Sequence, residues 1–107
     1  MNRRIVILDE AINDPDEVSG YLSQQNLGAG FRLLDAVQQA LGQLSRMPGL
    51  GERFETRNPS LEGLRCGSVP GFHNHRVFDL THDDRIEIVR VWHAARDLEG
   101  LLGPENE

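Results

Sequence analysis

Four side chains close to the C-terminal end of the sequence have the chemistry to move a proton, bind an anion or anchor a partner. They are Arg90, Trp92, His93 and Arg96. Histidine can serve as a general acid or base near neutral pH. Arginine and tryptophan are the residues that most often dominate the energy of protein interfaces. The cluster is therefore compatible with two functions, acid–base catalysis or docking onto another macromolecule.

The remaining histidines do not form a pattern typical of a metal site. His73 and His75 are two positions apart, and His82 follows in the same half of the chain. Zinc sites usually contain a pair of cysteines or a helical H-E-x-x-H motif. The sequence has a single cysteine, Cys66. We therefore expect neither a metal site nor a bound cofactor.

The cluster of four lies at the end of residues 85–93, whose composition predicts a β-strand. Apolar side chains occur at both even and odd positions, which predicts a strand in the interior of a sheet. Strict alternation gives one face with Ile86, Ile88, Arg90 and Trp92, and a second face with Glu87, Val89 and Val91.

These residues also have structural interpretations. A buried arginine needs an acidic partner, and the candidates for Arg90 are Glu62, Asp79 and Asp97. Trp92 shares its predicted face with two isoleucines and could belong to the core. Asp97 could cap a short helix.

Hydrophobic periodicity and turn residues place the other elements. We predict a single α+β domain over residues 1–107 with the order β-α-α-β-β-β, in which a helical hairpin packs on a curled antiparallel sheet. Residues 50–62 lack a period and are predicted to form a loop. The elements are a first strand (1–8), a helical hairpin (14–47), a three-stranded meander (63–93), a short closing helix (97–102) and a tail (103–107).

Two patterns define the helical hairpin. Asp14, Pro15 and Glu17 form a capping-box pattern, which predicts Asp14 as the N-cap of the first helix. Apolar residues then recur every three or four positions, as is typical of one helix face, and we expect this face to be shared by both helices. These residues are Leu27, Phe31, Leu34, Val37, Leu41 and Leu44.

Composition restricts the class of protein. The chain has 107 residues, a formal net charge of −6, and 11 cations that are all arginine. This charge argues against sequence-independent nucleic-acid binding, which depends on neutralising phosphates. No apolar run approaches the roughly 20 residues that span a bilayer. The lone cysteine and the lack of an export signal lead us to expect a cytoplasmic protein.

Nearly the whole chain, roughly residues 4–102, resembles a known family, and the specific motifs lie in its C-terminal half. LRCGSVPGFHNHRVFDL (64–80) and IEIVRVWHAARDLEGLL (86–102) are similar to the ParE branch of the RelE/ParE superfamily, small bacterial toxins of type II toxin–antitoxin systems. The family has the same order of elements. The chain departs from it at Phe78-Asp79-Leu80, where relatives carry F-Y-R, at Trp92, where they carry leucine, and at Ala94, where they carry glycine.

The resemblance implies one of two activities. RelE-like relatives cut messenger RNA on the ribosome, which needs an acid, a base and cations around the scissile phosphate. Here Arg65, Arg76, His93 and Arg96 would supply these groups. The nuclease members' lysines and late tyrosine are missing, and residues 60–96 contain five arginines and five acids. The sequence therefore favours a binding protein over an enzyme.

ParE-like relatives inhibit DNA gyrase, and docking needs no catalytic group. We expect a growth-inhibiting toxin whose favoured target is DNA gyrase, bound through Arg90, Trp92, His93 and Arg96. The alternatives are a ribosome-dependent mRNA endonuclease and a non-toxic antitoxin-binding relic, the latter suggested by Asp79.

The resemblance also implies a cognate antitoxin as partner, in a hetero-oligomer with this chain. The tail of such an antitoxin folds on binding and fills an apolar groove. Here that groove would lie over Phe31, Leu34 and Leu41 and the edge of the sheet.

Overall fold

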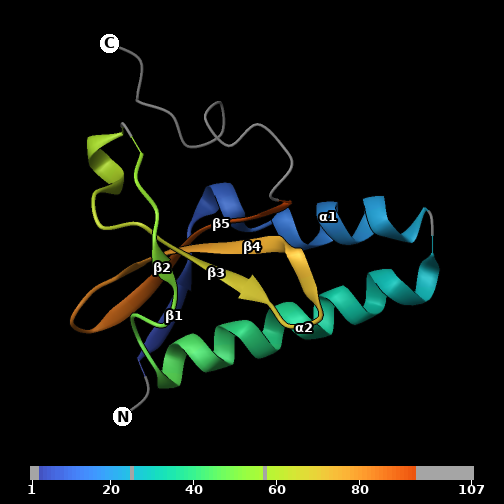
Figure 1. The fold of residues 1–107 in the computed structure, drawn as a ribbon, viewed down its shortest axis with the longest axis horizontal. Helices are drawn as coiled ribbons and strands as arrows, with labels where there is room; N and C mark the ends of the chain where they lie inside the picture. Colours follow the sequence, from blue (N-terminus) through green and yellow to red (C-terminus); the bar gives the residue numbers. More distant parts are fainter. Residues whose placement is uncertain (1–2, 25, 57, 94–107) are drawn as a thin grey trace.

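One mixed sheet of five strands organises the chain in the computed structural model, which describes residues 3–24, 26–56 and 58–93 (Figure 1). The strands are β1 (Arg4–Ile7), β2 (Glu52–Arg53), β3 (Arg65–Val69), β4 (Phe72–Thr81) and β5 (Arg85–His93). Their order across the sheet is β1-β5-β4-β3-β2, so β5 is an interior strand, as predicted. β1 pairs in parallel with β5 and the other neighbours are antiparallel, which makes the sheet mixed rather than wholly antiparallel.

The predicted helical hairpin consists of α1 (Asp14–Ser23) and α2 (Leu27–Arg46), which pack against each other and join at one end of the molecule (Figure 1). The Asn26 side chain accepts a hydrogen bond from the Ala29 N–H at 3.1 Å and caps α2. Two short 3-10 helices, η1 (Asp9–Ala11) and η2 (Pro59–Leu61), lie in the connections. No helix in the described ranges is long and apolar enough to cross a membrane. The predicted closing helix (97–102) and tail (103–107) lie outside these ranges.

The main core lies between α2 and the sheet. The sequence pattern was wrong about part of the buried face of α2, because Phe31 is 63% exposed and Leu34 and Leu41 are only half-buried. Alanines occupy much of the face of α2 that is buried in the structure, and their small side chains allow the helix to approach the sheet closely. The buried hydrophobic residues described on α2 are Ala29, Leu33, Ala36, Val37, Ala40 and Leu44.

A smaller hydrophobic cluster covers the opposite face of the sheet. Leu64, Phe78 and Val89 form its buried centre. The Phe54 ring meets the Phe78 ring edge-on, with centroids 5.3 Å apart. Phe54 and Leu61, from the segment predicted to be a loop, pack against this cluster. The same segment contains the edge strand β2, which the sequence pattern missed because two residues show no period.

A β-bulge interrupts the pairing of β4 with β5. Phe78 lies opposite Arg90, whereas the next residue, Asp79, lies opposite Ile88. Val89 is therefore the extra residue on β5.

This bulge changes which residues of β5 share a face. Ile86, Ile88 and Val91 belong to the core beneath the helices, whereas Val89 and Trp92 belong to the cluster on the other face. The predicted alternation, which grouped Trp92 with the two isoleucines, was wrong because one inserted residue shifts the period of a strand by one.

Gly30 allows α1 and α2 to pack closely, which leads to a first prediction. The Ser19 hydroxyl donates to the Gly30 carbonyl at 2.9 Å. A Cβ added at Gly30 would overlap Ser23 Oγ and lie 2.9 Å from the Ser19 carbonyl oxygen. Gly30→Ala is therefore expected to lower the free energy of unfolding by about 1–3 kcal/mol, although alanine is the better helix former.

The matched control for this prediction is Gly20→Ala on α1. A Cβ at Gly20 meets nothing within 4 Å, so that variant should be stabilised by up to about 1 kcal/mol. Urea denaturation of both variants gives the measurement. Equal effects of the two substitutions would contradict close packing at Gly30.

Candidate functional site

Arg90 is anchored by Asp14, at the first residue of α1. Its Nε and Nη2 donate to Asp14 Oδ2 and Oδ1 at 2.7 and 2.8 Å, and the Val91 N–H donates to Oδ2 at 3.0 Å. Asp14 is 1% exposed. It was predicted to cap α1, but the helix begins at Asp14 itself and the carboxylate points to β5. Asp14 was not among the partners expected for Arg90, because the two residues lie 76 positions apart.

Arg90 also contacts Trp92. The guanidinium carbon lies 4.8 Å from the centroid of the indole ring, within the range of a cation–π interaction. Trp92 is half-buried against the cluster of Leu64, Phe78 and Val89. Arginine and tryptophan thus form one ordered unit near the end of β5.

We use the term β5 rim for the four residues predicted to bind the target, Arg90, Trp92, His93 and Arg96. The structure brings the first two together. His93 ends β5 with its Cα opposite that of His75, and its side chain is not among those described. Arg96 lies outside the described residues. The role of the rim in target binding stays a prediction.

The two strand arginines of the nuclease hypothesis point to opposite faces of the sheet. Arg65 lies opposite Asp79, and its Nη1 donates to the Gly51 carbonyl at 2.8 Å. Arg76 lies between Ser68 on β3 and Trp92 on β5. Because an odd number of positions on β4 separates Asp79 from Arg76, the side chains of Arg65 and Arg76 cannot converge on one phosphate.

Asp79, which replaces the family's aromatic residue, is fully buried. Its Oδ2 accepts a hydrogen bond from the Thr81 hydroxyl at 3.1 Å, whereas Oδ1 has no hydrogen-bond partner among the described residues. Burial raises the pKa of the Asp79 carboxyl, and the Thr81 hydrogen bond and the Arg65 charge only partly oppose this shift. A side chain with 0% exposure does not contact a partner directly, so we expect Asp79 to affect the stability of the fold.

Replacing this carboxyl with an amide, Asp79→Asn, is expected to change the pH dependence of stability. A carboxyl whose pKa is raised by folding binds its proton more tightly in the folded chain. Its stabilising contribution is therefore complete below the unfolded pKa and is lost as the pH rises through the folded pKa. Relative to wild type, the variant should gain stability as the pH rises above about 4, the pKa of an aspartate in the unfolded chain, as measured by urea denaturation at a series of pH values.

The exposed Asp83 provides the control for this pH experiment. Asp83→Asn is measured at the same pH values, and Asp79→Asn should differ from it in the slope of stability against pH. A curve for Asp79→Asn parallel to that of wild type would contradict the raised pKa.

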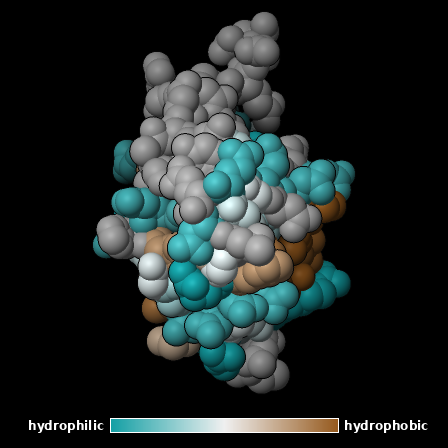
Figure 2. All heavy atoms as spheres, turned by 90° about the vertical axis from the view of Figure 1, so that its right-hand side faces the viewer, coloured by the Kyte–Doolittle hydropathy of each residue, from teal (hydrophilic) through white to brown (hydrophobic). Residues whose placement is uncertain are grey.

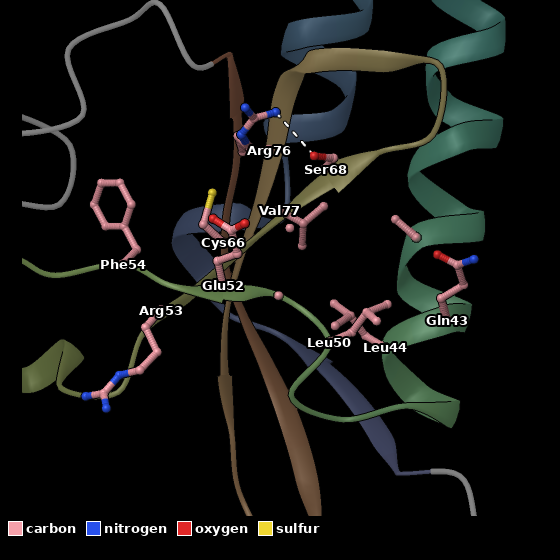
Figure 3. Close-up of a pocket in the computed structure, with 13 residues that line it drawn as sticks. Gln43, Leu44, Leu50, Glu52, Arg53, Phe54, Cys66, Ser68, Arg76 and Val77 are labelled. Carbon is pink, nitrogen blue, oxygen red and sulfur yellow. Dashed lines mark hydrogen bonds between the residues drawn. The ribbon is translucent and has the colours of Figure 1, made fainter.

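A cleft of about 610 Å³ lies between the second half of α2 and the β2–β3 edge of the sheet (Figure 3). Leu44 and Leu50 form one apolar end of it. Toward the other end the Cys66 thiol and the Glu52 carboxylate lie near Arg76 (Figure 3). We call this feature the edge cleft. Burial raises the pKa of Cys66, so the group is a neutral thiol and a weak nucleophile at neutral pH.

The outward side of α2 carries exposed apolar surface. Phe31, predicted to bind an antitoxin, is 63% exposed, and Leu34 beside it is half-buried. Figure 2, which looks onto the end of the molecule where α1 and α2 join, shows hydrophobic side chains among hydrophilic ones. Leu41, the third residue of the predicted groove, is partly buried and packs against the main core.

Charged side chains concentrate at the turn between β4 and β5. His82 Nε2 and Glu87 Oε1 are 2.9 Å apart, and the Arg85 guanidinium contacts Asp84. The hydrogen bond with His82 lowers the pKa of Glu87. Among the described residues, no group of three or more histidine, cysteine or acidic side chains could hold a metal ion.

Comparisons with known proteins identify a family and a shared fold. A family model described as the ParE toxin of the type II toxin–antitoxin system parDE matches residues 5–98. No curated protein sequence gives a match. The solved YoeB–YefM complex from Staphylococcus aureus is similar, with a TM-score of 0.51 and 20% identity, over 87% of this chain and 99% of that chain. At this identity the likeness establishes a shared fold.

Proposed function

This chain belongs to the ParE toxin family of type II toxin–antitoxin systems, and we propose that it inhibits growth by binding DNA gyrase through the β5 rim. In this proposal the chain binds its target and catalyses no covalent reaction itself. Binding by a tryptophan and arginines is common at the centre of interfaces, where such residues supply most of the affinity.

The observation that carries the proposal is the division of the strand arginines between two faces. RNA cleavage requires charged and proton-transferring groups around one phosphate. Arg65 instead donates to the Gly51 carbonyl. Arg76 points to the opposite face of the sheet from Arg65, and it pairs with Trp92 on β5. The net charge of −6 is also unfavourable for docking on ribosomal RNA. These features favour docking over a nuclease activity.

We further propose that a cognate antitoxin neutralises the chain. The similar YoeB–YefM structure is a complex of two proteins. Phe31 at 63% exposure and Leu50 at 50% exposure are large apolar side chains that a partner could cover. Phe31 lies on the outward side of α2 and Leu50 at the edge cleft, so an antitoxin tail that follows α2 would reach both.

Induction in a bacterium separates the candidate functions. DNA and messenger RNA are followed together after the chain is expressed without an antitoxin. Cleaved gyrase–DNA complexes and filamentation are expected. Codon-phased cuts in messenger RNA with an intact chromosome would contradict the proposal, and harmless induction would favour the non-toxic, antitoxin-binding alternative.

A further inference from the structure

The Asp14 carboxylate joins the first residue of α1 to two consecutive residues of β5. We propose that Asp14 is a positioning residue for Arg90 and Trp92 of the β5 rim, because it fixes the Arg90 guanidinium against the Trp92 ring and thereby sets the orientation of the indole. This inference rests on the proposed function for its biological consequence. Its structural part, the control of Trp92 by Asp14, can be tested separately.

The first support is the geometry of the ion pair. Asp14 accepts hydrogen bonds from both Nε and Nη2 of Arg90, at 2.7 and 2.8 Å. A carboxylate that grips two nitrogens of a planar guanidinium fixes the plane of the group as well as its position. The guanidinium carbon of Arg90 lies over the Trp92 ring, 4.8 Å from the ring centroid. Asp14, on another element, therefore sets which side of the guanidinium plane meets the ring.

The second support is the backbone of β5. β1 pairs with β5 only as far as Ile88, and the Leu8 N–H donates to the Ile88 carbonyl at 3.0 Å. Beyond that point β5 has no strand neighbour on this edge within the described residues. A buried N–H in this position needs another acceptor. Asp14 Oδ2 accepts the Val91 N–H at 3.0 Å, so the carboxylate also fixes the backbone directly before Trp92.

The third support is that an amide cannot replace this carboxylate. The Arg90 guanidinium and the Val91 N–H are all donors, and a carboxylate is an acceptor at both oxygens. Asparagine would turn one of its N–H groups toward a donor. Asp14→Asn therefore keeps the size of the side chain but loses the negative charge and the Oδ1 hydrogen bond from Arg90 Nη2, so the carboxylate's two-point contact with the guanidinium is lost.

The test uses the fluorescence of Trp92, which is the one tryptophan in the sequence. Asp14→Asn and Arg90→Lys are compared with wild type for emission maximum and for quenching by acrylamide. Arg90→Lys keeps a cation beside Asp14 but loses the planar fork, so the test still holds if Asp14→Asn does not fold. The matched control is Arg85→Lys, the same substitution on the same strand, at a residue whose contacts are Asp84 and Glu87.

We expect Asp14→Asn and Arg90→Lys to retain the circular dichroism of a folded chain. Both should change the emission and quenching of Trp92 and weaken binding to purified DNA gyrase about tenfold. Arg85→Lys should match wild type in both measurements. Unchanged Trp92 fluorescence in both folded variants would overturn the inference. Changed fluorescence with unchanged gyrase binding would retain the positioning of Trp92 and contradict the proposed docking surface.

Discussion

Replacing Asp14 with alanine is expected to lower the free energy of unfolding by about 3–5 kcal/mol, because the change leaves a largely buried guanidinium without its counter-charge. The Val91 N–H loses its acceptor in the same substitution. The Arg90 side chain is 17% exposed, so water can solvate part of it, and the lower end of the range is expected. Urea denaturation followed by circular dichroism measures the effect.

Glu17→Ala is the control for the Asp14 substitution, because Glu17 is an exposed acid on the same helix. It should cost less than about 0.5 kcal/mol. The double variant Asp14→Ala/Arg90→Ala should lose less than the sum of the single effects, because it leaves no unpaired charge. An Asp14→Ala variant as stable as Glu17→Ala would contradict the buried ion pair.

The second large effect is expected at Leu33, on the buried face of α2. Leu33 is 0% exposed and packs in the main core. Leu33→Ala should lower the free energy of unfolding by about 2–5 kcal/mol, since it removes buried apolar surface and leaves a cavity. Thermal or urea denaturation of the purified chain gives the measurement.

Phe31, two residues earlier on the same helix, provides the contrast with Leu33. It is 63% exposed, so Phe31→Ala should change stability by less than about 0.5 kcal/mol. If the antitoxin covers Phe31, the same variant should lose about tenfold in affinity for the antitoxin. A strongly destabilised Phe31→Ala variant would show that the sequence pattern was right about this face.

Much of the fold could be predicted from local sequence. Periodicity gave the helical hairpin, and β-branched residues gave Arg85–His93 as an interior strand. The buried face of α2 was harder to predict. A pattern of large apolar residues emphasises Phe31, but a helix that packs closely on a sheet does so through small residues such as Ala36 and Ala40.

The features that shape the candidate site depend on contacts distant in sequence. The extra residue Val89 reverses the alternation of β5 after it, and nothing in the composition of the strand marks a bulge. The partner of Arg90 is 76 positions away, in a segment whose helix-start pattern already explains an aspartate at position 14. A search for acidic partners of Arg90 that included acids at the starts of helices would have found Asp14.

Asp79 is a further residue whose surroundings could not be predicted from the local sequence. Asp79 was among the acids expected to pair with Arg90, because charged residues are rarely buried without a partner. The structure instead places it opposite Ile88, where one of its oxygens has no hydrogen-bond partner among the described residues. Sequence comparison with the family identifies Asp79 in place of an aromatic residue, but it does not reveal how this substitution changes the stability of the fold.

Binding of the purified chain to DNA gyrase, in parallel with its incubation with translating ribosomes, tests the central claim most directly. We predict that wild type binds gyrase and traps cleaved DNA, that Trp92→Ala binds about tenfold more weakly, and that messenger RNA on the ribosomes stays intact. Cleavage of that RNA by the wild-type chain, with no affinity for gyrase, would contradict the claim that this protein acts by docking.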